Sequence, residues 1–301
     1  MVAYRVVGTT WWSGGDYVRG RENLEKAVAA IGSEGDNGLT LRFGQDPGVS
    51  AGAYFALILF GLGQIDRARS FAEQAFARAL RSGHTATIVY GQFMKSTFEV
   101  LAGSPERAAP HAKATTALGR EHGMPAWVLI GIFYEGWVLS FTDPEHAIPE
   151  LRRGLALCRE AGVLNWLAQM VAMQAAVESD AGYVEDGLAR IDDFLAETQP
   201  VKQRWLDAEL HRHRGALLKR RTPAEPEAAE AAFKSALAIA RAQQTKTFEL
   251  RAATALARLW YDQGKRVDAH DLLAPVYGSF TEGFDTPDLK QAKALLSELA
   301  S

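Results

Sequence analysis

The clearest indication of the fold is the segment Ala229-Glu230-Ala231-Ala232-Phe233-Lys234-Ser235-Ala236. Ala229, Phe233 and Ala236 stand at positions one, five and eight of this segment, so all three share one face of an α-helix. Small residues beside a large one let a neighbouring helix approach closely while the ring fills the space between the two axes. The stretch therefore predicts a helix that packs tightly against a second helix.

Segments of the same kind recur along the whole chain. They begin at residues 20, 68, 108, 147, 187, 229 and 269, and successive starts are 48, 40, 39, 40, 42 and 40 residues apart. Most follow a turn glycine, such as Gly63 or Gly264, that can adopt the positive φ needed between two helices. A longer apolar segment precedes the turn, and no β-branched run alternates between turns as a strand would. A period near forty residues indicates a repeat built from helical hairpins.

The pattern A-x3-F-x2-A is typical of tetratricopeptide repeats, although their standard length is about 34 residues and HEAT or armadillo units have about 40–47. The alanine pattern favours tetratricopeptide-like repeats with lengthened helices, with HEAT-like packing as the alternative. We therefore predict an all-α superhelical solenoid in a single domain over residues 1–301, with about seven helical hairpins and a C-terminal capping helix. The predicted hairpins span roughly 1–31, 47–82, 85–122, 125–161, 165–198, 202–243 and 246–277, an inserted loop lies between 31 and 47, and the capping helix spans 287–300.

Composition narrows the classes of partner. The chain has 301 residues, of which 48% are hydrophobic and 23% charged, as in soluble globular proteins. Its net charge of −3 argues against nucleic acid, because nucleic-acid binders carry a basic excess. The single cysteine, Cys158, fits a reducing compartment, and the longest apolar run, 52–62, is about half of the ~20 residues that span a bilayer. We expect a cytoplasmic protein that binds neither nucleic acid nor membrane.

Seven short segments carry a resemblance to a known family. They read RFGQDPGV at 42–49, AELHR at 208–212, ELRAA at 249–253, ARLW at 257–260, QGK at 263–265, LLAPVYG at 272–278 and FTEGFDT at 280–286. They resemble the C-terminal tetratricopeptide region of large bacterial signalling proteins, which join a class III adenylate/guanylate cyclase domain, or another effector, to an AAA-type predicted ATPase. The resemblance covers most of the chain. It implies a regulatory or sensor region for signal transduction, with the ATPase or cyclase part of the same longer protein among its expected partners.

Motifs for catalysis are missing. The phosphate loop G-x4-G-K-[ST] is not formed at 264–266, where Gly-Lys-Arg lacks the upstream glycine and the hydroxyl residue. His211 and His213 are two residues apart on a predicted helix, so they point about 200° apart and cannot bind one metal ion together. No Ser/His/Asp arrangement can be assigned. We predict no enzymatic activity, no catalytic residues, no cofactor and no metal site.

Residues that face the groove follow from the geometry of the repeat. In a tetratricopeptide superhelix the first helix of each hairpin lines the concave side, and positions two, five and nine of that helix point inward when its small residue is position eight. This register selects Tyr90, Phe93, Phe133, Trp137, Gln169, Glu209, Arg212, Arg251 and Arg258. We expect the four charged residues to converge on a net positive patch that binds a carboxylate, a phosphate or an acidic stretch, while the aromatic residues hold the apolar part of the ligand. The alternative is a solvated face on which the arginines pair with neighbouring acids.

Two further groups are secondary candidates. Trp127, Trp166 and Trp205 recur at intervals of 39 residues, which suits either packing between repeats or a stack of rings for a ligand. Arg42, Gln45 and Asp46 precede Pro47, and Asp46 also suits the N-cap of a helix that begins with proline. The sequence thus predicts a non-catalytic protein that binds a protein or peptide partner in its concave groove. The alternative is a small-molecule inducer in the same groove.

Overall fold

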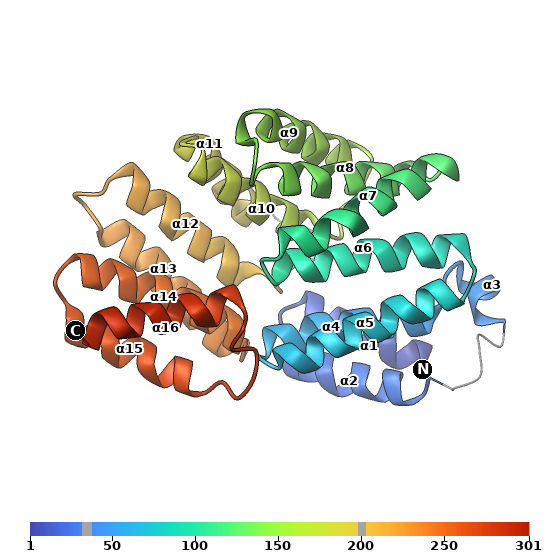
Figure 1. Ribbon diagram of the computed structural model, residues 1–301, viewed down its shortest axis with the longest axis horizontal. Coiled ribbons are helices and arrows are strands. Elements are labelled where there is room, and N and C mark those ends of the chain that lie inside the picture. Colours follow the sequence, from blue (N-terminus) through green and yellow to red (C-terminus); the bar gives the residue numbers. More distant parts are fainter. Residues whose placement is uncertain (32–37, 198–202, 301) are drawn as a thin grey trace.

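Alternating first and second helices make up the structure (Figure 1). The computed structural model describes residues 1–31, 38–197 and 203–300, and all the regular elements in these segments are helices. The first helices are α1 (Val2–Ser13), α4 (Pro47–Gly61), α6 (Thr85–Leu101), α8 (Pro125–Leu139), α10 (Leu167–Asp180), α12 (Asp207–Arg221) and α14 (Lys246–Asp262). The second helices are α2 (Tyr17–Ala29), α5 (Ile65–Arg81), α7 (Pro105–Glu121), α9 (Pro144–Glu160), α11 (Val184–Ala196), α13 (Glu227–Ala242) and α15 (Arg266–Gly278).

Each first helix packs against the second helix that follows it, which gives seven hairpins among the described residues. Each first helix also contacts the next first helix along the array, which places the first helices on the inside of the curve. After the last hairpin, α16 (Pro287–Ala300) packs on α14 and α15 as a cap. The predicted all-α, tetratricopeptide-like solenoid is confirmed.

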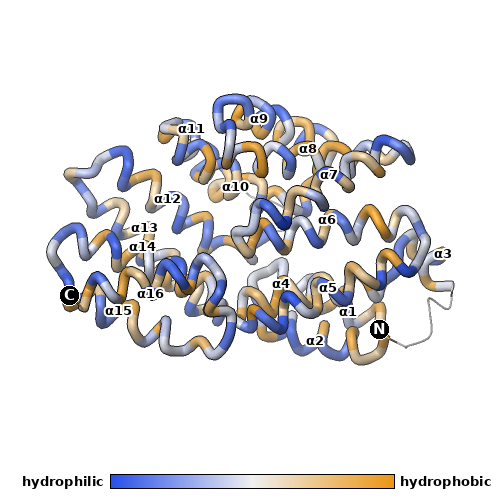
Figure 2. The backbone as a smooth tube through the Cα atoms, viewed as in Figure 1, coloured by the Kyte–Doolittle hydropathy of each residue, from blue (hydrophilic) through white to orange (hydrophobic). Residues whose placement is uncertain are grey.

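Burial differs between the two kinds of helix. In α4 every residue except Tyr54 is buried, whereas α5 buries a stripe of residues that recur every three or four positions, from Ile65 through Ala68, Ala72 and Ala75 to Ala79. The same contrast separates the largely apolar α8 from α9, where polar and apolar residues alternate (Figure 2). Helices that are apolar all round lie inside a protein, and helices with one apolar stripe lie at its surface.

The repeat motif packs the two helices of a hairpin closely together, as the sequence predicts. Phe233 of α13 lies against Gly215 of α12, and a Cβ atom at Gly215 would stand 2.6 Å from the ring. Ala229 and Ala236 are buried on the same face as Phe233. The predicted N-cap is also formed, because the Asp46 carboxylate accepts from the Gly48 N–H at 2.7 Å and Pro47 opens α4. The insertion differs from the predicted loop: residues 32–37 lie outside the described residues, and the short helix α3 (Leu39–Phe43) follows them.

The array bends far enough for its two ends to meet. The Tyr17 hydroxyl of α2 donates to the Trp205 carbonyl at 2.8 Å, across 188 residues of sequence. The Thr247 hydroxyl at the start of α14 donates to the Phe60 carbonyl at the end of α4, and α4 and α14 are in contact. Figure 1 shows the first hairpins, in blue, beside the last ones, in orange and red. The solenoid is therefore closed on itself, and the seam joins its first two hairpins to its last two.

Candidate functional site

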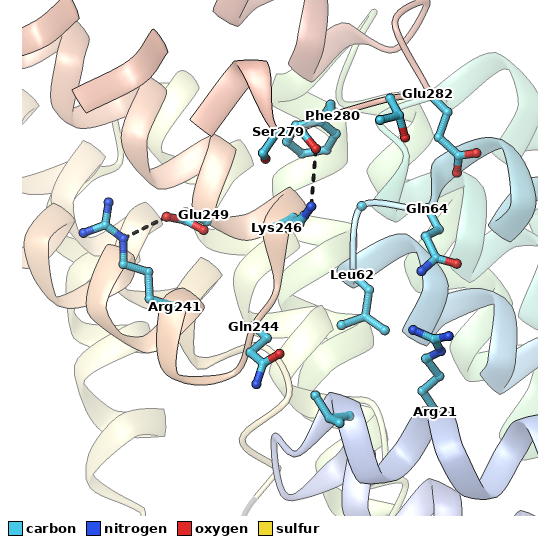
Figure 3. Close-up of a pocket in the computed structure, with 13 residues that line it drawn as sticks. Arg21, Leu62, Gln64, Arg241, Gln244, Lys246, Glu249, Ser279, Phe280 and Glu282 are labelled. Carbon is cyan, nitrogen blue, oxygen red and sulfur yellow. Dashed lines mark hydrogen bonds and ion pairs between the residues drawn. The ribbon is translucent and has the colours of Figure 1, made fainter. Parts of the chain in front are cut away.

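Two of the cavities among the described residues are large, one at the seam and one inside the curve. The seam cavity, of about 760 Å³, lies between the first and last hairpins and is lined by α2, the turn after α4, the α13–α14 turn and the segment after α15 (Figure 3). The central cavity, of about 980 Å³, lies inside the curve of the first helices. It is lined by residues of α6, α8, α10, α12 and α14, with α13 and α16 contributing further side chains. The central cavity is the candidate functional site, because it occupies the concave face that the repeat geometry assigns to ligands.

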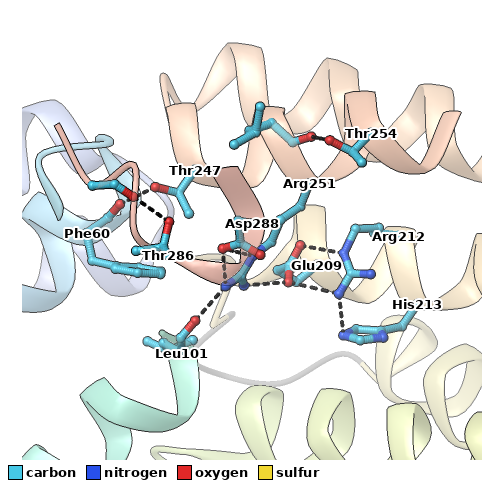
Figure 4. Close-up of polar contacts among 12 residues, drawn as sticks. Phe60, Leu101, Glu209, Arg212, His213, Thr247, Arg251, Thr254, Thr286 and Asp288 are labelled. Carbon is cyan, nitrogen blue, oxygen red and sulfur yellow. Dashed lines mark hydrogen bonds and ion pairs between the residues drawn. The ribbon is translucent and has the colours of Figure 1, made fainter. Parts of the chain in front are cut away.

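Arg251 is the centre of its polar wall (Figure 4). The guanidinium donates to Glu209 of α12 at 2.9 Å, to Asp288 of α16 at 2.9 Å and to the carbonyl of Leu101 at the end of α6. Arg212 donates to both oxygens of Glu209, at 2.8 and 3.1 Å. The planar fork of arginine allows such multiple donation. One buried network thus joins three hairpins and the cap.

The ionisation of this network follows from its neighbours. Burial acts to raise the pKa of Glu209, but Arg212 and Arg251 outweigh it and hold that pKa well below the usual range. Burial acts to lower the pKa of Arg251, and Asp288 and Glu209 more than offset this, so the net shift is upward. Burial and the adjacent Arg212 lower the pKa of His213 to about 3. Its Nε2 lies 2.9 Å from Arg212, which can only donate, so the neutral ring accepts there.

Another part of the cavity lining, the apolar wall, is formed by apolar side chains. Trp137 of α8 meets Phe141 edge to face, with ring centroids 4.9 Å apart, and Phe141 is 58% exposed. Met173 of α10 and Leu295 of α16 also line the cavity. A ligand that fits must therefore present both apolar and polar groups.

Gln169 adds an unused donor at the cavity. The Tyr134 hydroxyl donates to its Oε1 at 3.1 Å, and that hydroxyl is also 3.1 Å from the Thr97 hydroxyl. Within the described residues the Gln169 Nε2 has no hydrogen-bond partner, although the side chain is buried and lines the cavity. A buried donor without a partner costs about 1–3 kcal/mol. An acceptor brought by a ligand would recover this energy.

Six of the nine predicted groove residues line the central cavity: Trp137, Gln169, Glu209, Arg212, Arg251 and Arg258. The other three need correction. Tyr90 and Phe93 are buried because the inside of the tight curve is filled by rings: Phe93 lies 5.4 Å from Trp127 and 5.0 Å from Trp166. Phe133 is fully buried because it packs on Gly154 of its own hairpin.

The charge of the polar wall also needs correction. The predicted excess of three arginines over one carboxylate is balanced by two acids that the sequence did not place there. Asp288 pairs with Arg251 at 2.8 Å, and Glu298 pairs with Arg258 at 2.6 Å. Both acids belong to α16, whose position over the groove depends on how the cap folds back. The alternative interpretation, in which the arginines pair with neighbouring acids, describes these side chains.

The secondary candidates lie away from the central cavity. Trp166 and Trp205 are buried with Trp12 in an aromatic cluster, with centroids 6.1 Å apart for Trp12–Trp166 and 4.5 Å for Trp12–Trp205. Trp127 packs against Phe93 and Tyr90. These tryptophans serve packing, and their ring stack is not part of the cavity wall.

Arg42, Gln45 and Asp46 do not form a ligand site at the cavity either. Asp46 is buried, caps α4 and forms an ion pair with Arg78 at 2.7 Å. Arg42 lies over the ring of its neighbour Phe43, 5.6 Å from the centroid. Sequence reasoning missed Phe141, Met173, Asp288 and Gln291, which do line the cavity. An aromatic residue directly after a first helix, as at Phe141, was the one available signal.

Over the part of the chain that the structure describes, no group of three or more His, Cys, Asp or Glu side chains is arranged to bind a metal ion. None of the described helices combines the length and the apolar character that crossing a bilayer requires.

Solved structures share this architecture. The crystal structure of NprR in complex with its cognate peptide NprX aligns with a TM-score of 0.60 at 12% identity, over 99% of this chain and 82% of that one. The apo form of RapI aligns with a TM-score of 0.56 at 11% identity, over 98% of both chains. At such low identity the likeness shows the fold alone. Neither the known protein families nor the curated proteins contain a match, so the resemblance to cyclase- and ATPase-linked regions stays a prediction.

Proposed function

We propose that the protein is a non-catalytic, regulatory peptide receptor and that the peptide binds in the central cavity. The observation that carries this proposal is the cavity itself: about 980 Å³ on the concave face, lined both by apolar side chains and by paired charges. That volume is at the upper end of the ~300–1,000 Å³ range of ligand pockets, so it admits a short peptide as well as a small molecule. An amphipathic peptide matches the two walls.

The apolar wall provides the anchor. Phe141 is exposed although it is large and aromatic, and Trp137 supports it from the core side. Aromatic residues in the centre of a binding surface contribute much of the affinity when a ligand removes them from water. We expect one or two apolar side chains of the peptide to lie between Phe141 and Met173.

The polar wall sets the charge of the ligand. Arg212, Arg251 and Arg258 pair with Glu209, Asp288 and Glu298. Lys219 and Arg220, which also line the cavity, pair with Asp262 and Asp180. Because each of these cations already has an acidic partner, the wall does not select a strongly acidic peptide. The unpaired Gln169 Nε2 instead suits a main-chain carbonyl, which every peptide offers. NprR, which shares the fold, was crystallised with a peptide, and this supports a peptide as the ligand class. The resemblance to bacterial signalling proteins further suggests that the receptor regulates an ATPase or another effector.

Affinity selection tests this proposal. The purified chain is mixed with a random peptide library, bound peptides are identified by mass spectrometry, and enriched sequences are synthesised for measurements of Kd. Phe141→Ala should weaken binding about tenfold or more, because it removes the exposed anchor. Phe284→Ala is the matched control: Phe284 is 50% exposed, lies edge to face with Tyr277 and is not among the residues that line the cavity.

Equal Kd values for the two variants would overturn the central cavity as the peptide site. A library without any enriched peptide, together with a co-purifying small molecule that Phe141→Ala releases, would replace the peptide by a small-molecule inducer.

A further inference from the structure

The seam cavity contains charges that the protein does not use. Figure 3 shows its two walls: Arg241, Glu249 and Lys246 on one side, Arg21, Gln64 and Glu282 on the other. On the first wall Arg241 donates to Glu249 at 2.8 Å, and the Lys246 ammonium donates to the Ser279 carbonyl at 3.3 Å. These charged groups of the first wall therefore already have partners within the protein.

Two charged groups of the second wall lack such partners among the described residues. Among the described residues Arg21 forms no ion pair and no hydrogen bond, although it is half-buried and lines the cavity. Glu282 is also half-buried, and its Oε1 is removed from solvent with no hydrogen-bond donor from the described part of the chain beside it. Charged groups that leave water are normally paired. The two charges have opposite signs but stand apart, with Gln64 between them (Figure 3).

A strained residue marks the same cavity. Gln244 has φ = 57° and is the only non-glycine residue with a positive φ in residues 1–31, 38–197 and 203–300. Comparable turns use glycine, as at Gly63 and Gly264. A side chain at such a position costs free energy, and strain of this kind collects at functional sites. The Gln244 side chain lines the seam cavity.

We propose that the seam cavity is a second ligand site, distinct from the central cavity, and that it binds a short zwitterionic peptide. The ligand's ammonium group pairs with Glu282, its carboxylate pairs with Arg21, and its amide groups meet Gln64 and Gln244. The separation of Arg21 from Glu282 by a whole side chain selects a peptide over a single amino acid, whose charges are adjacent. Since Arg21 belongs to α2 and Glu282 follows α15, the bound ligand also joins the first hairpin to the last.

Trialanine and its two capped forms test the proposal by calorimetric titration of the full chain. Trialanine should bind, and both N-acetyl-trialanine and trialanine amide should bind about tenfold more weakly, because each lacks one charge. In Glu282→Gln the acetyl group should no longer matter, and in Arg21→Gln the amide should no longer matter. Glu22→Gln, an exposed charge change beside Arg21, is the matched control and should keep both preferences.

A further variant, Gln244→Gly, distinguishes a loss of binding from a loss of folding. Gln244→Gly relaxes the backbone, so it should raise Tm while it weakens trialanine binding. Phe141→Ala should leave trialanine binding unchanged, which separates this site from the central cavity. The proposal is overturned if trialanine does not bind at millimolar concentration, if the capped forms bind equally well, or if Phe141→Ala abolishes binding.

Discussion

At the scale of single residues, Arg251 has the most partners in the central cavity. It donates to side chains of two helices and to the main chain of a third, and two carboxylates share its charge. A buried ion pair contributes little net stability compared with an apolar replacement, but removal of one partner leaves a charge in a poorly solvated place. Arg258, seven residues along the same helix, forms an exposed pair with Glu298 instead.

The two arginines should therefore respond differently to the same change. Arg251→Met should lower the free energy of unfolding by about 3–5 kcal/mol, because it leaves Asp288 and part of Glu209 without a partner. Arg258→Met should lower it by about 1 kcal/mol or less. Urea titration followed by circular dichroism measures both. Similar losses for the two variants would show that the buried network is no more important than a surface ion pair.

His213 makes the free energy of unfolding depend on pH. Its pKa is about 3 in the folded chain, whereas an unfolded histidine titrates near ~6.5. Between these values the unfolded chain holds one more proton at this residue, so acidification lowers the free energy of unfolding by at most about 1.4 kcal/mol per pH unit. Glu209, with a lowered pKa, adds a loss only below the ordinary pKa of a glutamate.

Urea titrations between about pH 7 and pH 4.5 test this dependence. His213→Gln, which still offers Arg212 an acceptor, should show a shallower loss than the unmodified chain. Parallel slopes for the two proteins would mean that His213 titrates normally in the folded state.

At the scale of elements, each hairpin depends on how closely its two helices approach. Phe233 lies against Gly215 because the glycine leaves room for the ring. Gly278, at the end of α15, has no atom within 4 Å of the place where a Cβ would stand. Gly215 is therefore needed for the close packing of the two helices, whereas Gly278 has room for a side chain.

The same glycine-to-alanine substitution should change the stability of the protein in opposite directions at these two sites. Gly215→Ala should destabilise the protein by about 1–3 kcal/mol, because its Cβ overpacks against Phe233. Gly278→Ala should stabilise it by up to about 1 kcal/mol, because alanine loses less backbone entropy in a helix. Thermal unfolding of both variants provides the measurement. If Gly215→Ala left the thermal stability unchanged, the two helices of the hairpin would be able to move apart without loss of stability.

At the scale of the whole molecule, closure sets this array apart from an open solenoid, in which each repeat contacts only its neighbours. Hydrogen bonds across the seam join Tyr17 to Trp205 and Thr247 to Phe60. The aromatic cluster of Trp12, Trp166 and Trp205 joins the first helix to α10 and α12. These contacts couple hairpins that are far apart in sequence.

Removal of the two hydroxyls at the seam should weaken this coupling. Tyr17→Phe and Thr247→Val each leave a buried carbonyl with one donor fewer, at a cost of about 1–3 kcal/mol. In the double variant the part of the tryptophan fluorescence that comes from Trp12, Trp166 and Trp205, three of the seven tryptophans, should change at lower urea than the helical circular dichroism signal. The two transitions should coincide in the unmodified chain and in Tyr183→Phe/Thr142→Val, which loses two surface hydroxyls. Coincident transitions in the seam variant would contradict the role of closure.

The hairpins and much of the groove can be predicted from the pattern of residues along the chain. The small residues from Gly20 to Ala269 recur with the period of the repeat, and helix geometry alone then places Trp137, Gln169, Glu209, Arg212 and Arg251 on the inner face. These features depend on contacts within a hairpin or between neighbouring hairpins, whose spacing can be read along the chain.

The curvature of the array, and with it the set of residues on the inner face, depends on tertiary packing. A small rotation at each hairpin adds up over seven hairpins, so local patterns cannot fix where the ends meet. Closure forms the seam cavity between Arg21 and Glu282, whose proximity depends on the summed geometry of all the repeats between them. The return of α16 onto α14 brings Asp288 and Glu298 to the arginines, and rings from other hairpins bury Phe93. These contacts depend on how whole helices are oriented against one another, which the spacing of small residues along the chain does not fix.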